Sequence, residues 1–192
     1  MLTELFVMLV TFVLINNVIL NQFLGMCPFM GVSKKSSSAL GMGVAVTFVI
    51  LAASIVTYGL YYLVLVPMNL QYMDLITFIL VIAALVQLVE MFIKKMSPSL
   101  YKALGVYLPL ITTNCVVLNV TLNNISNGYN FVEMLTYSFA IPLGFTLVLY
   151  IFSTIRERLD ASDVPTSWMG NPIALIVAAI MSLAFSGLMG LV

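Results

Sequence analysis

The residues of this chain best suited to chemistry are its two cysteines, Cys27 and Cys115. The sequence has no histidine, which excludes Ser-His-Asp and Cys-His catalytic arrangements and imidazole metal ligands. Thiolates in apolar surroundings are costly unless a metal takes up their charge, and iron is a typical metal for them. A four-thiolate iron–sulfur site would need two further ligands from another chain. The alternatives are two small buried side chains, or a disulfide, which a reducing compartment disfavours.

Amide and hydroxyl side chains cluster around both cysteines, within otherwise apolar sequence. They are Asn16, Asn17, Asn21 and Gln22 before the first cysteine, and Thr112, Thr113, Asn114 and Asn119 around the second. Amides inside a membrane span are expensive and uncommon, and oxygen ligands suit a hard cation. We therefore expect these residues to line an ion path or to surround the metal centre. Hydrogen bonding between helices is the structural alternative.

The composition determines the class of protein that must position these residues. Of 192 residues, 62% are hydrophobic and only 7% are charged, with seven Lys+Arg balancing seven Asp+Glu. A soluble domain is about one quarter charged, so this chain cannot cover a water-facing surface. The balanced charge also excludes a basic nucleic-acid binder. The sequence predicts an all-α integral membrane protein.

Six segments are long and apolar enough to cross a bilayer, which takes about 20 residues. These predicted transmembrane helices lie near residues 3–24, 39–65, 71–93, 103–122, 131–153 and 172–191. All basic residues fall in alternate connections, at Lys34, Lys35, Lys94, Lys95, Lys102, Arg156 and Arg158. By the positive-inside rule these connections are cytoplasmic, and both termini are extracytoplasmic.

An internal duplication is indicated by two asparagine-containing motifs. The pattern Asn-x-Val-x-Leu-Asn begins at Asn16 and again at Asn114, 98 positions later. It divides a single membrane domain into a first repeat, 1–96, and a second repeat, 97–192. Three spans per repeat invert the second repeat relative to the first, as in many transport folds whose functional groups lie at broken helices.

Glycine and proline predict where the broken helices lie. Gly25 and Pro28 flank Cys27, and Pro109 precedes Cys115, where it removes a helix donor. We therefore expect span one to kink or re-enter between residues 21 and 28, and span four to be broken before its cysteine.

The motifs around the cysteines resemble those of the A-subunit family of Rnf electron-transport complexes. They comprise Asn16-Asn17 with residues 22–35, and residues 107–115. The segments 156–158 and 172–185 are similar as well, so the resemblance covers essentially the whole chain. The related E subunit of the sodium-pumping NADH:quinone reductase shares much of this pattern.

The resemblance implies a subunit of a bacterial inner-membrane translocase, an ion-translocating ferredoxin:NAD⁺ oxidoreductase, with no independent catalytic site. Such complexes oxidise ferredoxin, reduce NAD⁺ and move Na⁺ or H⁺ outward. The A subunit pairs with a homologous RnfE-like subunit of opposite orientation, alongside the other Rnf subunits. By this resemblance, Cys27 and Cys115 are ligands of a shared [2Fe–2S] cluster, or of a single iron. Electrons would pass from ferredoxin/NAD-side clusters through it to an extracytoplasmic flavin.

Two other functions remain open from the sequence alone. One is a small inverted-repeat secondary transporter that uses its asparagines and has structural cysteines. The other is a purely structural membrane subunit. Visible absorbance would separate the transporter from an iron protein, because a transporter is colourless.

Overall fold

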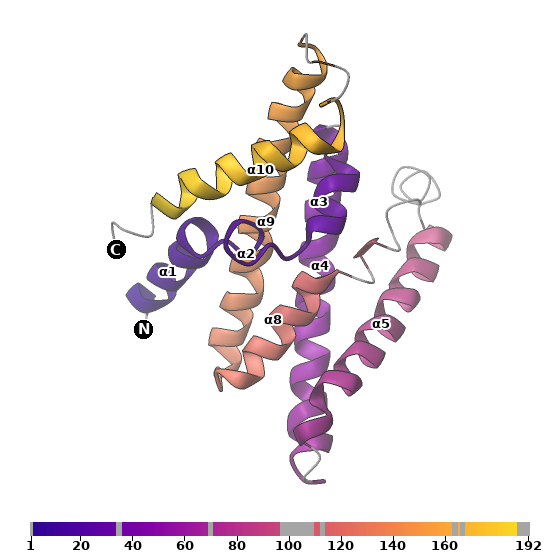
Figure 1. The fold of residues 1–192 in the computed structure, drawn as a ribbon. Coiled ribbons are helices and arrows are strands. Elements are labelled where there is room, and N and C mark those ends of the chain that lie inside the picture. Colours follow the sequence, from indigo (N-terminus) through magenta and orange to yellow (C-terminus); the bar gives the residue numbers. More distant parts are fainter. Residues whose placement is uncertain are drawn as a thin grey trace.

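The described part of the chain is helical throughout. The computed structural model describes residues 2–33, 36–68, 71–96, 110–111, 114–162, 165 and 168–187, and no strand occurs among them. Figure 1 shows how the helices are arranged. In chain order they are α1 (Leu2–Val10), the π-helical η1 (Thr11–Ile15), α2 (Val18–Gln22), α3 (Met26–Val32), α4 (Ser36–Leu60), the π-helical η2 (Tyr61–Leu65), the 3₁₀ turn η3 (Gln71–Met73), α5 (Asp74–Met96), α8 (Cys115–Ser126), α9 (Phe131–Asp160) and α10 (Asn171–Ser186).

Three helical segments of the described residues are long and apolar enough to cross a membrane. The first is Ser36–Leu65, in which α4 continues into η2. The second is Asp74–Met91, the apolar part of α5, and the third is Phe131–Asp160, the whole of α9. The predicted second, third and fifth spans are therefore confirmed as long apolar helices. The helix of the fifth span continues past its predicted end at residue 153 to Asp160.

Shorter apolar helices overlap the other three predicted spans. They are Phe6–Ile15, Cys115–Ser126 and Asn171–Ser186. The last has 16 residues, which rise about 24 Å at 1.5 Å per residue. Residues 103–109 of the predicted fourth span, including Pro109, lie outside the described residues.

The prediction for the first span was partly wrong. It expected one irregular segment between residues 21 and 28, whereas the helix is interrupted twice, at Asn16–Asn17 and at Phe23–Gly25. Pro28 does not break the chain, because it is the third residue of α3. The first four N–H groups of a helix have no partner within it, so a proline there removes no helical hydrogen bond.

Helices α4 and α9 form the centre of the fold. They lie side by side and run in opposite directions (Figure 1), with the most extensive helix–helix contact of the described residues. Toward the end of α4 and the start of α9, the Ser138 hydroxyl donates to Ser54 Oγ at 2.9 Å. Closer to the start of α4, Gly43 packs directly against the Thr146 side chain. Helix α8 packs on both of these helices, and α5 flanks α4 and α8.

The short N-terminal helices pack against this centre and against α10. Gly144 of α9 lets η1 approach closely, because a Cβ there would lie 2.9 Å from the Val13 carbonyl oxygen. On the other side, Ser182 of α10 donates to the Leu20 carbonyl of α2 at 2.8 Å. The interrupted first segment is thus held between α9 and α10.

The basic side chains of the described helices lie in or next to the last turns of α5 and α9, which run toward the same side of the molecule. The last turn of α5 carries Lys94 and Lys95, and the last turn of α9 carries Arg158. The end of α9 meets the start of α4, because Ser36 N donates to Glu157 Oε1 at 2.9 Å. Figure 1 shows the last turn of α5 toward this same end.

Candidate metal centre

Two buried asparagines begin the helices next to the cysteines. The Asn17 side chain accepts a hydrogen bond from Ile19 N at 3.1 Å and caps α2. The Asn114 side chain accepts from Val116 N at 3.1 Å and caps α8. Both residues have an extended backbone, the usual conformation for a capping residue.

The two caps differ by one position from the register of the predicted duplication. Asn17 and Asn114 are 97 positions apart, one fewer than the offset that aligned Asn16 with Asn114. The sequence alignment compared residue types alone. In the structure, the residue that caps the helix after each break is the one whose side chain accepts from the backbone N–H two positions later. In this register, Gln22 corresponds to Asn119.

The chain between α2 and α3 makes a turn that requires glycine. Phe23 and Gly25 both have positive φ, 54° and 80°, in the left-handed region that most side chains avoid. A Cβ at Gly25 would lie 2.7 Å from Phe145 Cε2 and 2.9 Å from Val116 Cγ2. The turn ends at Met26, the first residue of α3, so that Cys27 lies in the first turn of this helix.

The two cysteine segments meet through one hydrogen bond. Gly25 N donates to Cys115 Sγ at 2.9 Å, across 90 positions of sequence. Cys27 is two residues from Gly25, and two residues span at most about 7 Å. The structure therefore brings the two cysteine-containing segments together, at the starts of α3 and α8.

The thiols fit part of a metal site. Both are free cysteines; Cys27 is exposed and Cys115 is half-buried. Among the described residues, no group of three or more Cys, Asp or Glu could hold a metal ion. The start of α8, at Cys115, is the positive end of its helix dipole, which favours negative charge on a ligand. This donor set matches two ligands of a four-thiolate iron site whose other ligands come from elsewhere.

A buried arginine holds the helix that carries Cys27. Arg156 of α9 is 4% exposed, and its Nη1 donates to the Met30 carbonyl at 2.9 Å and to Ser33 Oγ at 2.8 Å. These acceptors lie in and just after the last turn of α3. From the sequence, Arg156 was a marker of topology and part of the family resemblance, and its contact with α3 was not predicted because no local pattern indicates a contact across 126 positions.

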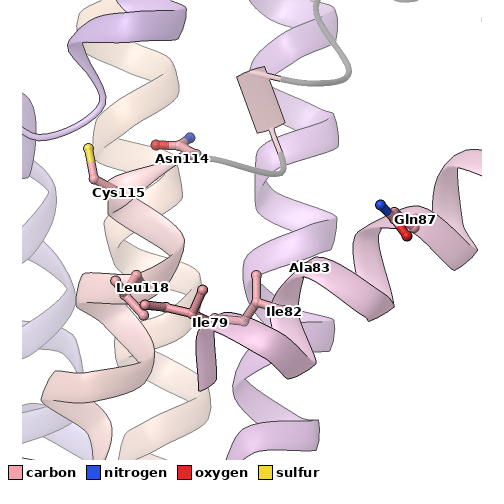
Figure 2. Close-up of a pocket in the computed structure, with 7 residues that line it drawn as sticks. All are labelled: Ile79, Ile82, Ala83, Gln87, Asn114, Cys115 and Leu118. Carbon is pink, nitrogen blue, oxygen red and sulfur yellow. The ribbon is translucent and has the colours of Figure 1, made fainter. Parts of the chain in front are cut away.

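A cavity of about 500 Å³ lies beside Cys115, between α5 and α8. Figure 2 shows its lining residues, with Asn114 and Cys115 at the start of α8 and the Cys115 sulfur pointing away from Leu118. The lining is Ile79, Ile82, Ala83, Gln87, Asn114, Cys115 and Leu118. Asn114 Nδ2 is buried and has no hydrogen-bond partner among the described residues.

Hydrogen bonds join the predicted polar residues in two separate sets, of which the second, at Gln22 and Asn119, begins a chain of amides that leads away from the cysteines. Asn21 Nδ2 donates to the Ile15 carbonyl at 3.0 Å and to Asn16 Oδ1 at 3.4 Å. Asn119 Nδ2 donates to Gln22 Oε1 at 3.3 Å, joining the two cysteine segments a second time. Thr112 and Thr113 lie outside the described residues.

Residues that were not predicted from the sequence extend this chain. Asn123 Nδ2 donates to Asn119 Oδ1 at 3.3 Å and to the Tyr137 hydroxyl at 3.2 Å. A second cavity, of about 170 Å³, lies at this point. Its lining is Phe12, Asn16, Val18, Gln22, Asn123, Asn127, Tyr129, Tyr137 and Ile141. The spacing of Asn119, Asn123 and Asn127, four apart on one helix face, was the signal available in the sequence.

Comparison with known proteins gives matches over nearly the whole chain. Residues 5–192 match the family model described as "Rnf-Nqr subunit, membrane protein". The chain is 56% identical over 189 residues to an Acetobacterium woodii protein, named as the A subunit of a Na(+)-translocating ferredoxin:NAD(+) oxidoreductase complex, covering 98% of each. It is 53% identical, with 98% of each covered, to a Syntrophotalea carbinolica protein named as the A subunit of an ion-translocating oxidoreductase complex. An Escherichia coli protein of that name is also 53% identical, over 99% of this chain and 98% of its own.

Proposed function

This chain belongs to the Rnf-Nqr family of membrane subunits, and we propose that it is the A subunit of an ion-translocating ferredoxin:NAD⁺ oxidoreductase complex. Within that complex, Cys27 and Cys115 would hold an intramembrane iron centre together with two cysteines of a homologous RnfE-like subunit. The group is a [2Fe–2S] cluster, or alternatively a single iron, and when bound it supplies one-electron transfer. The chain would thereby carry electrons between the ferredoxin/NAD-side clusters and an extracytoplasmic flavin.

The observation that carries this proposal is the hydrogen bond from Gly25 N to Cys115 Sγ. Without it, two cysteines in separate helical segments would be equally compatible with small buried side chains. With it, the starts of the two cysteine-containing helices, α3 and α8, are in contact, and Cys27 is exposed for contact with another chain. Two thiolates are half of the ligands that an iron–sulfur cluster needs.

Six spans arranged as two inverted repeats, 1–96 and 97–192, are part of the proposal. The antiparallel pairing of α4 with α9 supports it, because corresponding helices of inverted repeats run in opposite directions. The equivalent caps at Asn17 and Asn114 support it as well. So does the contact between Gln22 and Asn119, since corresponding residues meet where a twofold axis passes.

We propose a bacterial inner-membrane location with the basic end of the molecule in the cytoplasm and both termini outside. Support comes from Lys94, Lys95, Arg156 and Arg158, whose helices end toward one side. Cytoplasmic connections carry an excess of lysine and arginine.

The chain of amides is the proposed ion path for Na⁺ or H⁺. It runs from the break at Gly25 past Gln22 and Asn119 to Asn123 and the 170 Å³ cavity. Amide oxygens can replace the water around a hard cation. Asn16 lines the same cavity, which supports including the interruption at Asn16–Asn17 in this path.

The test is to purify this chain alone and together with its homologous partner, and to measure iron, acid-labile sulfide and visible absorbance. We expect little iron in the chain alone and a stoichiometric, coloured centre in the pair. A colourless, iron-free pair within an active complex would instead support the secondary transporter. A full complement of iron in the chain alone would contradict the shared site.

A further inference from the structure

We propose that the backbone N–H of Gly25 is a positioning group that raises the reduction potential of the thiolate-held centre. This inference rests on the proposed function, because it concerns the iron that Cys27 and Cys115 would hold. It starts from the 2.9 Å distance between Gly25 N and Cys115 Sγ. The sulfur that would bind iron already accepts a hydrogen bond from the protein.

The backbone around Gly25 is bent in a way that directs this N–H at the sulfur. Phe23 is the one non-glycine residue with positive φ in the described part of the chain, and such outliers cluster at functional sites. Gly25 has φ of 80° and precedes the first turn of α3. Between these two residues, the chain leaves α2 and starts α3, and the Gly25 N–H points out of both helices at Cys115.

Side chains of two other helices fix the turn in place. A Cβ at Gly25 would meet Phe145 Cε2 of α9 and Val116 Cγ2 of α8. Phe145 is 1% exposed and Val116 is fully buried. Any other residue at position 25 would therefore push the turn away from α8 and lengthen the hydrogen bond to the sulfur.

The effect on potential follows from the charge of the acceptor. When the centre takes up one electron from the reduced carriers of the complex, no bond forms or breaks, and the added negative charge spreads over the iron and its sulfur ligands. A hydrogen bond to a more negative acceptor is stronger, so the Gly25 N–H stabilises the reduced state more than the oxidised one. Hydrogen bonds to sulfur are among the factors that set the potential of iron–sulfur clusters.

The first test locates the donor by spectroscopy on the intact complex. The complex is grown with ¹⁵N-glycine, reduced chemically, and studied by pulsed electron paramagnetic resonance. We expect a ¹⁵N coupling that disappears in Gly25→Ala, where the nitrogen at position 25 is no longer labelled. Gly31→Ala is the matched control, because a Cβ there meets only Leu110 Cδ1, at 3.4 Å, and the coupling should persist.

The second test measures the potential. The double variant Gly25→Ala/Phe145→Leu relieves the contact with Phe145, whereas the contact with Val116 of α8 remains and still displaces the turn from the sulfur. Phe145→Leu alone keeps the Gly25 turn. At a fixed ambient potential, we expect the ratio of reduced to oxidised centre to fall about tenfold in the double variant relative to Phe145→Leu. For a one-electron couple this equals about 59 mV.

The outcomes separate this inference from the proposed function. The signal of this centre is the one that Cys115→Ser removes, whereas signals of the ferredoxin/NAD-side clusters persist in that variant. If this signal shows no glycine coupling, or equal potentials in the two variants, the role of Gly25 is overturned and the proposed function stays intact. The absence of any signal that depends on Cys115 from the reduced wild-type complex would overturn both.

Discussion

At the scale of single residues, the candidate site depends as much on the groups that hold helix ends as on the thiols. Cys115 begins α8, which Asn114 caps, and Cys27 lies in α3, which Gly25 precedes and Arg156 holds at its far end. The positions of both sulfurs therefore depend on the groups that hold the ends of these two helices. Changes at these supporting residues should alter the site without touching a ligand.

Asn114→Ala should destabilise the complex, because it removes the acceptor for Val116 N at a buried helix start. The expected loss is about 1 kcal/mol, measured by thermal unfolding of the purified complex in detergent. Asn114→Ser is the control, since serine keeps a capping oxygen and removes the unpartnered Nδ2. Equal losses in the two variants would show that the cap contributes nothing.

Arg156→Lys should loosen the helix that carries Cys27. A lysine ammonium has no planar fork, so it cannot reproduce the guanidinium geometry toward Met30 O and Ser33 Oγ. Loss of a hydrogen bond to a charged group costs about 1.5–3 kcal/mol, and thermal unfolding would measure it. The exposed Arg158→Lys is the matched control on the same helix and should change stability little. Similar losses at both positions would argue against a special role for Arg156.

At this scale, the sequence indicated the two candidate ligands and part of their surroundings. Residue type alone selected Cys27 and Cys115, and the cost of amides in a membrane selected Asn17, Asn114 and Asn119. Gly25 was predicted as part of the break next to Cys27. Its hydrogen bond to Cys115, and those of Arg156 to α3, were not predictable, because each depends on a partner 90 or more positions away.

At the scale of elements, the close pairing of α4 and α9 depends on small side chains. Gly43→Leu should destabilise the fold, because a Cβ at this position already overlaps the Thr146 side chain. Overpacking costs typically 1–3 kcal/mol, which the unfolding temperature of the complex would report. Gly59→Leu is the control on the same helix, since nothing lies within 4 Å of its Cβ position. If both variants were equally stable, the two helices would not pack as described.

The long helices were predictable, whereas the interruptions of the first segment were predictable only in part. An uninterrupted apolar run is sufficient to predict α4, α5 and α9, because the bilayer sets their length. The break at Asn16–Asn17 depends on a side chain that competes with the backbone for hydrogen bonds. Its occurrence also requires the close approach of η1 to Gly144 of α9, which no local sequence pattern indicates.

At the scale of the whole molecule, the proposed orientation in the membrane rests on the distribution of charge and can be tested directly. Ser126 and Ser162 are exposed residues. Ser126 is the last residue of α8, which carries Asn119 and Asn123, and Ser162 follows the basic end of α9. We expect Ser126→Cys to react with an impermeant thiol reagent in intact cells, and Ser162→Cys to react only after permeabilisation. The unsubstituted chain is the control for labelling of Cys27 and Cys115. The reverse pattern would invert the topology and the direction of electron flow.

The central claim is that Cys27 and Cys115 together supply half of the ligands of one shared iron centre. The most direct measurement is iron and acid-labile sulfide per assembled complex in wild type, Cys27→Ser and Cys115→Ser, with subunit composition checked in each. The account predicts that either substitution abolishes the centre and its visible absorbance while the subunits remain assembled. A full complement of iron and sulfide in either serine variant would contradict it.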